Sequence, residues 1–143
     1  MVLKADSVRS RLRNLEEVVS RLQQVGPLGA QQLATSFRDA WLVERGLQLG
    51  AEIILDVGNH ILSAHFGLSA DKHEEVVALL AREGVIDEDL RVRLTGIGGF
   101  RNILVHDYLR IDPALVADNL ARAPRDFSDF GAAIDRWLEK IGE

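Results

Sequence analysis

Apolar residues recur every three or four positions along almost the whole chain, a spacing that places side chains on one face of an α-helix. Near the N-terminus the pattern predicts a helix from about Leu3 to Val25, ended by Gly26-Pro27. A second, longer helix is predicted from about Leu33 to Phe66. The core-facing positions expected along it are Leu42, Gly46, Leu49, Ile53, Val57, His60 and Ala64.

The remaining chain carries the same helical spacing, interrupted by glycine, proline and acidic residues. A third helix is predicted over about Asp71–Arg82, and a fourth from near Asp87 to about Tyr108. Asp112-Pro113 is typical of a helix start, so a short fifth helix begins there and stops before Pro124. The last helix spans about Phe127 to Ile141. Because no strand-like alternation occurs, we expect an all-α, antiparallel helical bundle.

Composition narrows the class of protein. A chain of 143 residues usually forms one domain, so we expect residues 1–143 to fold as a single helical domain. The chain has no cysteine, which excludes disulfides, iron–sulfur clusters and cysteine nucleophiles. No apolar run is long enough to cross a membrane, and no signal peptide begins the chain. We therefore expect a cytoplasmic protein without a membrane partner.

Charge is distributed unevenly along this acidic chain, whose formal net charge is −5. Residues 71–90 carry seven acidic and two basic side chains, whereas residues 91–110 carry four arginines against Asp107 alone. A local basic patch suits a ligand that bears phosphate groups. The alternative is a solvated face or a contact with the acidic third helix.

Five polar residues gather within eight positions of the otherwise apolar fourth helix: Arg101, Asn102, His106, Asp107 and Tyr108. On an ideal helix Asn102 and His106 share a face, while Arg101 lies about 140° from His106, so the two would flank a groove. Histidine suits proton transfer near neutral pH, and arginine suits phosphate oxygens. The pair fits metal-free cleavage of an RNA phosphodiester, although such spacing also occurs in structural roles.

The stretch Arg101-Asn102-x3-His106-x-Tyr108 resembles the Arg-x4-His-x-Tyr signature of the HEPN superfamily. Residues 99–112 more closely resemble the HepT-type toxins, which are partners of MntA-type minimal nucleotidyltransferase antitoxins. Residues 43–61 are similar to the second helix of that family. The resemblance covers most of the chain, and the order of the helices agrees.

This resemblance implies a HEPN-like four-helix core with short additional helices, assembled as a homodimer whose two motif helices line a shared cleft. It implies the toxin of a type VII-like toxin–antitoxin module, acting as a metal-independent endoribonuclease without a cofactor. Arg101 and His106 are the expected catalytic pair, with Asn102 and Asp107 in support. Tyr108 matches the tyrosine to which the cognate nucleotidyltransferase transfers AMP. Added charge and bulk there would block a cleft meant for phosphate.

Several residues keep two interpretations. Arg45 could hold RNA, or a carboxylate of the second helix could orient Arg101; the alternative is a solvated face or internal ion pairs. Asp56 and His60 have helical spacing for a shared metal, but no Glu-x-x-His pair exists, so we expect no metal. Trp41 and Trp137 are expected in the core or in a dimer interface.

Two further alternatives concern the glycines and the function. The three glycines Gly96, Gly98 and Gly99 either allow two motif helices to approach across a dimer or break the helix locally. The competing function is a non-catalytic helical interaction module that binds a nucleotidyltransferase or a nucleotide.

Overall fold

The structure, a computed structural model, describes residues 2–106 and 111–143 of the chain. Within these ranges it contains α-helices and no β-strand, which confirms the all-α prediction. The helices are α1 (Ala5–Val25), α2 (Ala30–Thr35), α3 (Phe37–Phe66), α4 (Glu75–Arg82), α5 (Glu88–Arg93), α6 (Ile97–His106) and α7 (Pro113–Lys140).

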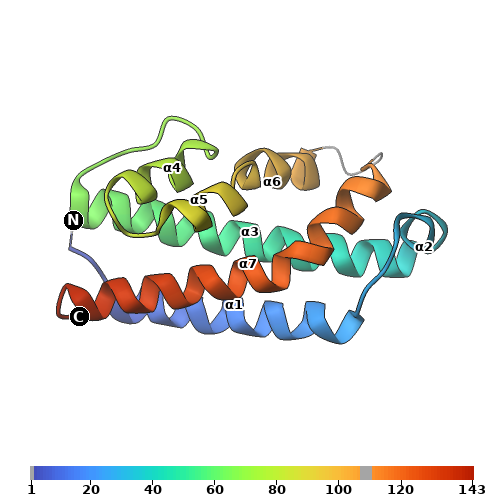
Figure 1. Ribbon diagram of the computed structural model, residues 1–143, viewed down its shortest axis with the longest axis horizontal. Helices are drawn as coiled ribbons and strands as arrows, with labels where there is room; N and C mark the ends of the chain where they lie inside the picture. Colours follow the sequence, from blue (N-terminus) through green and yellow to red (C-terminus); the bar gives the residue numbers. More distant parts are fainter. Residues whose placement is uncertain (1, 107–110) are drawn as a thin grey trace.

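The long helix α3 is the centre of the bundle (Figure 1). It packs against α1 and α7 on one side and against α4 and α6 on the other. The short helices α4, α5 and α6 follow one another along α3 (Figure 1). This order places the polar motif of α6 directly over the middle of α3.

The core-facing side of α3 differs from the predicted stripe by about one position. Leu42, assigned to the core from its spacing, is 51% exposed, whereas its neighbour Val43 is fully buried. The residues of α3 that are buried are Val43, Leu47, Gly50, Ala51, Ile54, Leu55, Val57, Gly58, Ile61 and Leu62. Because α3 has neighbours on two sides, its apolar arc is broad, and spacing alone chose one edge of that arc.

The predicted helix over Leu33–Phe66 is two helices, separated at Ser36. The Ser36 backbone is extended, and its hydroxyl accepts a hydrogen bond from the Asp39 amide at 3.2 Å. This is the N-cap arrangement, which satisfies one of the free amides at the start of α3. Ser36, although it lies within a continuous apolar pattern, therefore marks the start of α3.

Two predictions about the fifth and last helices are wrong, because α7 continues through Pro124 as one helix. Proline removes one backbone hydrogen bond and costs roughly 3 kcal/mol inside a helix. Its buried positions nevertheless keep one helical phase across the proline: Val116, Leu120, Ala123, Phe127, Phe130, Ile134 and Trp137. Burial of this continuous apolar stripe against α1 and α3 outweighs the lost bond.

The predicted fourth helix, Asp87–Tyr108, is in fact two helices, with α5 ending at Arg93 and α6 beginning at Ile97. Gly96 between them has a φ of +87°, a backbone conformation that glycine adopts without strain. The interpretation of these glycines as a helix break is thus confirmed at Gly96.

Gly98 serves a close approach within the chain. A Cβ atom at this position would lie 2.6 Å from the backbone nitrogen of Glu74 and 2.7 Å from the carbonyl carbon of His73. Both atoms belong to the backbone just before α4, so they cannot rotate away. Hydrogen as a side chain is what allows α6 to dock here.

We expect Gly98→Ala to lower the free energy of unfolding by about 1–3 kcal/mol, because overpacking against backbone must shift α6 or α4. Denaturant titration followed by circular dichroism measures this change. Gly131→Ala in α7 is the matched control, since its Cβ would meet nothing within 4 Å. That control should be neutral or stabilising by up to ~1 kcal/mol. Equal effects of both substitutions would contradict the packing argument.

Candidate functional site

Helix α6 has a buried apolar side and a polar side that carries the described residues of the motif. Phe100 and Leu104 are buried, so α6 turns this side toward the bundle. Arg101 is partly buried, whereas Asn102 and His106 are exposed. The predicted residues Asp107 and Tyr108 lie outside the described residues. The structure therefore places Asn102 and His106 on the exposed side of α6, whereas Arg101 lies at its edge and turns toward α3.

Arg101 is held from two directions. Its Nη2 atom lies 3.6 Å from Oε1 of Glu52 on α3, and its Nη1 atom donates a hydrogen bond to Oδ1 of Asn102 at 3.3 Å. Gln48, one turn earlier on α3, donates a hydrogen bond from Nε2 to the same Glu52 oxygen at 3.2 Å. The guanidinium is thus oriented by a carboxylate that is itself fixed. Of the carboxylates on the predicted second helix, Glu52 is the one that forms an ion pair with Arg101.

The imidazole of His106 is exposed in the last turn of α6. Within the described part of the chain it has no hydrogen bond or ion pair. Asn102, one turn earlier, shares its face of the helix. An exposed imidazole can exchange a proton with bound RNA, and a guanidinium on the same helix can neutralise the charge of the phosphate.

Two arginines of the basic patch predicted over residues 91–110 form ion pairs with nearby carboxylates. Arg91 pairs with Glu88 at 2.6 Å, a contact within the same helix. Arg93 reaches α7, where its Nη1 donates to Asp126 at 2.8 Å and to Asp129 at 2.9 Å. The hydrogen bond to Asp126 raises the pKa of Arg93 above its ordinary value. Among the described arginines of this patch, Arg101 alone lies in the motif.

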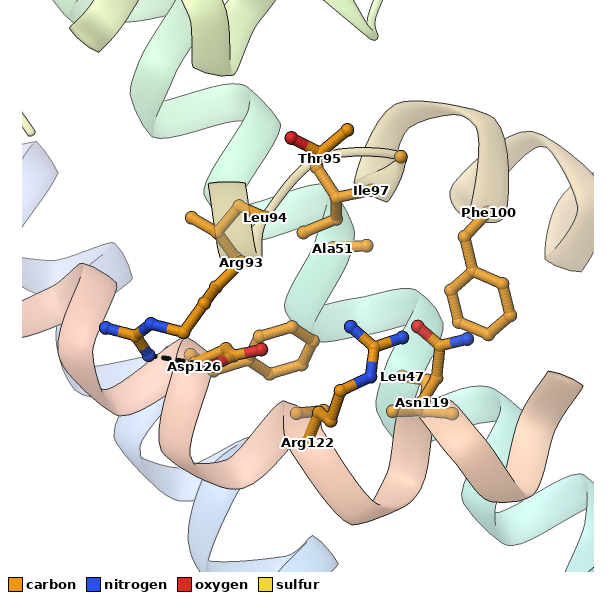
Figure 2. A pocket seen from close by; sticks show the side chains of 13 residues that line it. Leu47, Ala51, Arg93, Leu94, Thr95, Ile97, Phe100, Asn119, Arg122 and Asp126 are labelled. Carbon is orange, nitrogen blue, oxygen red and sulfur yellow. Dashed lines mark hydrogen bonds and ion pairs between the residues drawn. The ribbon is translucent and has the colours of Figure 1, made fainter. Parts of the chain in front are cut away.

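Figure 2 shows Arg93 crossing from α5 to Asp126 on α7, at the wall of a small hollow between α3 and α7. The hollow measures about 130 Å³, and the ring of Phe100 lines it from α6. Asp126 is the one charged or polar residue that is buried among the described residues. Sequence reasoning missed this pair, whose members are 33 positions apart and have no helical spacing.

His60 takes part in tying the N-terminus to α3. Its Nε2 atom accepts a hydrogen bond from the Lys4 amide at 3.0 Å. Partial burial lowers the pKa of His60, and the positive charges of Arg11 and Lys4 lower it further. The imidazole is therefore neutral in the fold and acts as an acceptor for the chain before α1.

We expect His60 to make stability fall as the pH is lowered. Because its pKa is lower in the folded chain, the unfolded chain binds the proton more readily as the pH falls through about 6.5. The denaturant midpoint should drop more between pH 7.5 and pH 5 for the wild type than for His60→Gln. His73→Gln, at an exposed position before α4, should keep the wild-type dependence. The same pH profile in all three proteins would contradict this assignment.

The two tryptophans have different environments. Trp137 is buried, and its ring packs edge-on against His65 at 4.9 Å between centroids, which confirms a core role. Trp41 is 69% exposed, so the core interpretation is wrong for it and the interface interpretation remains. The exposed ring of Phe37 lies beside it, with 6.2 Å between centroids.

A family model described as Ribonuclease HepT-like matches residues 15–134. The chain belongs to the HepT-like ribonuclease family. This confirms the predicted HEPN and HepT resemblance and the predicted enzyme class. No helix in residues 2–106 and 111–143 combines the length and the apolar content that crossing a membrane requires.

Curated relatives of this HepT-like chain are nucleases. A tRNA nuclease HepT from Aphanizomenon flos-aquae is 24% identical over 136 residues, covering 95% of this chain and 92% of the relative. An mRNA nuclease HepT from Shewanella oneidensis is 27% identical over 127 residues, covering 87% and 93%. The two relatives are named for different RNA classes.

A solved structure of a tri-AMPylated Shewanella oneidensis HEPN toxin in complex with an MNT antitoxin superposes on this HepT-like chain with a TM-score of 0.78. It is 26% identical, and the match covers 90% of this chain and 96% of the toxin. The protein YutE from Bacillus subtilis, of unknown function, has the same fold, with a TM-score of 0.83 and 21% identity. The predicted helical architecture of the family is thereby confirmed.

Proposed function

We propose that this protein is a metal-independent endoribonuclease, the toxin of a type VII-like toxin–antitoxin module, and that Arg101 and His106 carry its chemistry. The observation that supports this most is the fixed guanidinium of Arg101, paired with Glu52, on the same short helix as the exposed His106. The nuclease names of its relatives agree with it. Residues 1–143 act as one domain in the cytoplasm, where RNA is available.

The reaction follows from the two side chains. His106 accepts the proton of the ribose 2′-hydroxyl, and the freed oxygen attacks the adjacent phosphorus. The bond from phosphorus to the 5′-oxygen breaks, water donates a proton to that leaving oxygen, and His106 returns its own proton to the solvent. Arg101 neutralises the charge that grows on the phosphoryl oxygens, with Asn102 beside it. The products are a 2′,3′-cyclic phosphate and a 5′-hydroxyl.

A second copy of the chain completes the site. At 100° per residue, Phe37, Trp41, Glu44, Gln48 and Glu52 fall within about 80° on one stripe of α3. This stripe begins with two exposed aromatic rings and ends at the partner of Arg101. Burial raises the pKa of the Glu44 carboxyl in the same stripe. A two-fold contact over this stripe would cover the aromatic rings and bring two α6 helices together.

Regulation involves a nucleotidyltransferase partner of the MntA type. The structural neighbour described above is AMPylated and bound to such an antitoxin. Transfer of AMP to Tyr108 would add a negative charge and a nucleoside two positions beyond His106. Repulsion between this phosphate and the RNA backbone would then silence the toxin.

RNA cleavage by the purified protein in excess EDTA tests the proposed function. We expect total RNA or tRNA to be cut, with 2′,3′-cyclic phosphate ends detected by mass spectrometry. Cleavage that requires added Mg²⁺ would overturn the metal-independent mechanism. A folded protein without cleavage on either RNA, but stabilised against heat by ATP or AMP, would favour the non-catalytic interaction module.

Glu52→Gln tests the orientation of Arg101. Glutamine keeps the size of the side chain and one acceptor oxygen but loses the charge that holds the guanidinium. We expect kcat to fall about tenfold, which corresponds to ~1.4 kcal/mol of transition-state stabilisation. Cleavage kinetics on a labelled RNA measure it, with Asp56→Asn, an exposed carboxylate one turn along α3, as the control. An unchanged kcat would leave Glu52 with a structural role only.

A further inference from the structure

A second surface, separate from the motif, runs between α1 and α3. It is a groove of about 410 Å³, and apolar side chains form its floor. The lining residues that are apolar or lack a side chain are Val18, Leu22, Val25, Trp41, Leu42, Gly46 and Leu49. Leu42 and Trp41 are among the most exposed large apolar residues of the described chain. Exposed apolar surface in a concave site marks a contact for another molecule.

The groove forms because α1 and α3 approach closely at Gly46. A Cβ atom on Gly46 would lie 2.7 Å from Cδ2 of Leu22, so Leu22 packs onto the backbone of α3. Leu22 is buried in the core, so the packing of the bundle fixes this part of the groove.

Three arginines surround this apolar floor: Arg21 from α1 and Arg38 and Arg45 from α3. Arg21 pairs with Glu17 at 2.8 Å, but both side chains are exposed, and such a pair is weak. Arg38 and Arg45 are exposed, and within the described ranges neither has an ion pair or a hydrogen bond. A chain with a net charge of −5 thus places unneutralised positive charge around one apolar groove.

This groove is distinct from the stripe assigned to the homodimer. At 100° per residue, the centre of the set Arg38, Leu42, Arg45 and Leu49 lies about 90° around α3 from the centre of the dimer stripe. The two surfaces share Trp41, which belongs to the stripe and also lines the groove. Arg101 and His106 do not line the groove, so a partner in the groove does not cover the motif.

We propose that this groove binds an amphipathic helix of a partner protein, with apolar residues on one face and carboxylates along its edges. A helix is convex and about 10 Å wide, and its i, i+3, i+4 and i+7 side chains fit an apolar groove. Carboxylates at its edges pair with Arg21, Arg38 and Arg45. A second copy of the groove does not fit, because its lining would bring three more arginines and no carboxylate to pair with them. A flat membrane surface matches a groove poorly.

Two synthetic peptides test the proposal on the full-length protein. Each has about five helical turns with leucines every three or four positions; one carries glutamates along the edges of the leucine face and the other carries lysines. We expect the glutamate peptide to bind, as measured by fluorescence anisotropy, and to bind less tightly as salt rises. Equal binding of the lysine peptide, or no binding of either, would overturn the proposal.

Variants locate the binding. Leu42→Glu, and separately the double substitution Arg38→Glu and Arg45→Glu, should each weaken the glutamate peptide at least tenfold. The matched control, Arg13→Glu with Arg136→Glu, makes the same change in net charge at exposed positions outside the groove and should bind like the wild type. Loss of binding in that control would contradict a groove-specific contact.

Two other occupants are distinguishable in the same experiment. If Leu42→Glu reduced the assembly size of the protein alone in sedimentation, the occupant would be a second copy and the proposal would fail. Binding of anionic vesicles that is lost in the same variants, without peptide binding, would identify a membrane surface instead. RNA cleavage is read separately, so failure of this proposal leaves the proposed nuclease function intact.

Discussion

His106→Ala is expected to lower the rate of RNA cleavage by about 10²- to 10⁴-fold, the range that a general acid–base group contributes. Alanine cannot accept the proton of the 2′-hydroxyl, and within the described residues no other histidine lies on α6. Because the imidazole is exposed and has no described partner, the fold should keep its stability. Initial rates on a labelled RNA in EDTA, with a denaturant titration of the same samples, measure both effects.

Two controls make this result specific to proton transfer. His73→Ala, at an exposed position before α4, should retain the wild-type rate. Free imidazole in the buffer should restore part of the activity of His106→Ala, because it supplies the missing base. A variant that cleaves as fast as the wild type would exclude His106 from the reaction. A slow variant with a lowered unfolding midpoint would instead indicate a structural role.

Arg93→Ala is expected to lower the free energy of unfolding by about 2–4 kcal/mol, or roughly 30- to 1,000-fold in the unfolding equilibrium. Removing the guanidinium leaves the buried carboxylate of Asp126 without its ion pair. The value is set below that of a fully buried pair, because the Arg93 side chain keeps 22% exposure. Denaturant unfolding at neutral pH measures the loss.

The neighbouring arginine offers a matched control for Arg93. Arg91→Ala removes a pair with the exposed Glu88 in the same helix and should lower the free energy of unfolding much less than Arg93→Ala does. Replacing Arg93 by methionine together with Asp126 by leucine should recover much of the stability, because no charge is then buried alone. If Arg93→Ala and Arg91→Ala cost the same, the contact between α5 and α7 does not stabilise the fold.

The helix ends that the sequence predicted well are those with strong local signals. Gly26-Pro27 ends α1, and Asp112 caps α7 because its carboxylate accepts a hydrogen bond from the Ala114 amide. Such signals act within one turn, so their physics is contained in neighbouring residues. The signal at Gly96 was also local, since three glycines within four positions weaken a helix. The apolar spacing nevertheless continues from α5 into α6, so it predicted one helix where there are two.

At Pro124, by contrast, the strong local signal gave the wrong prediction. A proline signals a helix end, yet α7 continues, because the apolar stripe keeps its phase on both sides and is buried against α1 and α3. Likewise, the spacing of apolar residues predicted the apolar arc of α3 but placed its centre about one position away. It also left Trp41 with both a core and an interface interpretation. Which side of a helix is covered depends on its neighbours, and the sequence of that helix does not contain them.

For the candidate site, the sequence by itself determined that the residue types of an acid–base nuclease, Arg101, Asn102 and His106, lie within two turns of one helix. It also determined the family, through the motif and the second helix. Only the tertiary structure decided that Glu52 and Gln48 orient Arg101, that Arg93 forms an ion pair with Asp126, and that three arginines surround an apolar groove. Helical periodicity is a local property of the chain, whereas these contacts join distant segments whose approach is set by packing of the whole bundle.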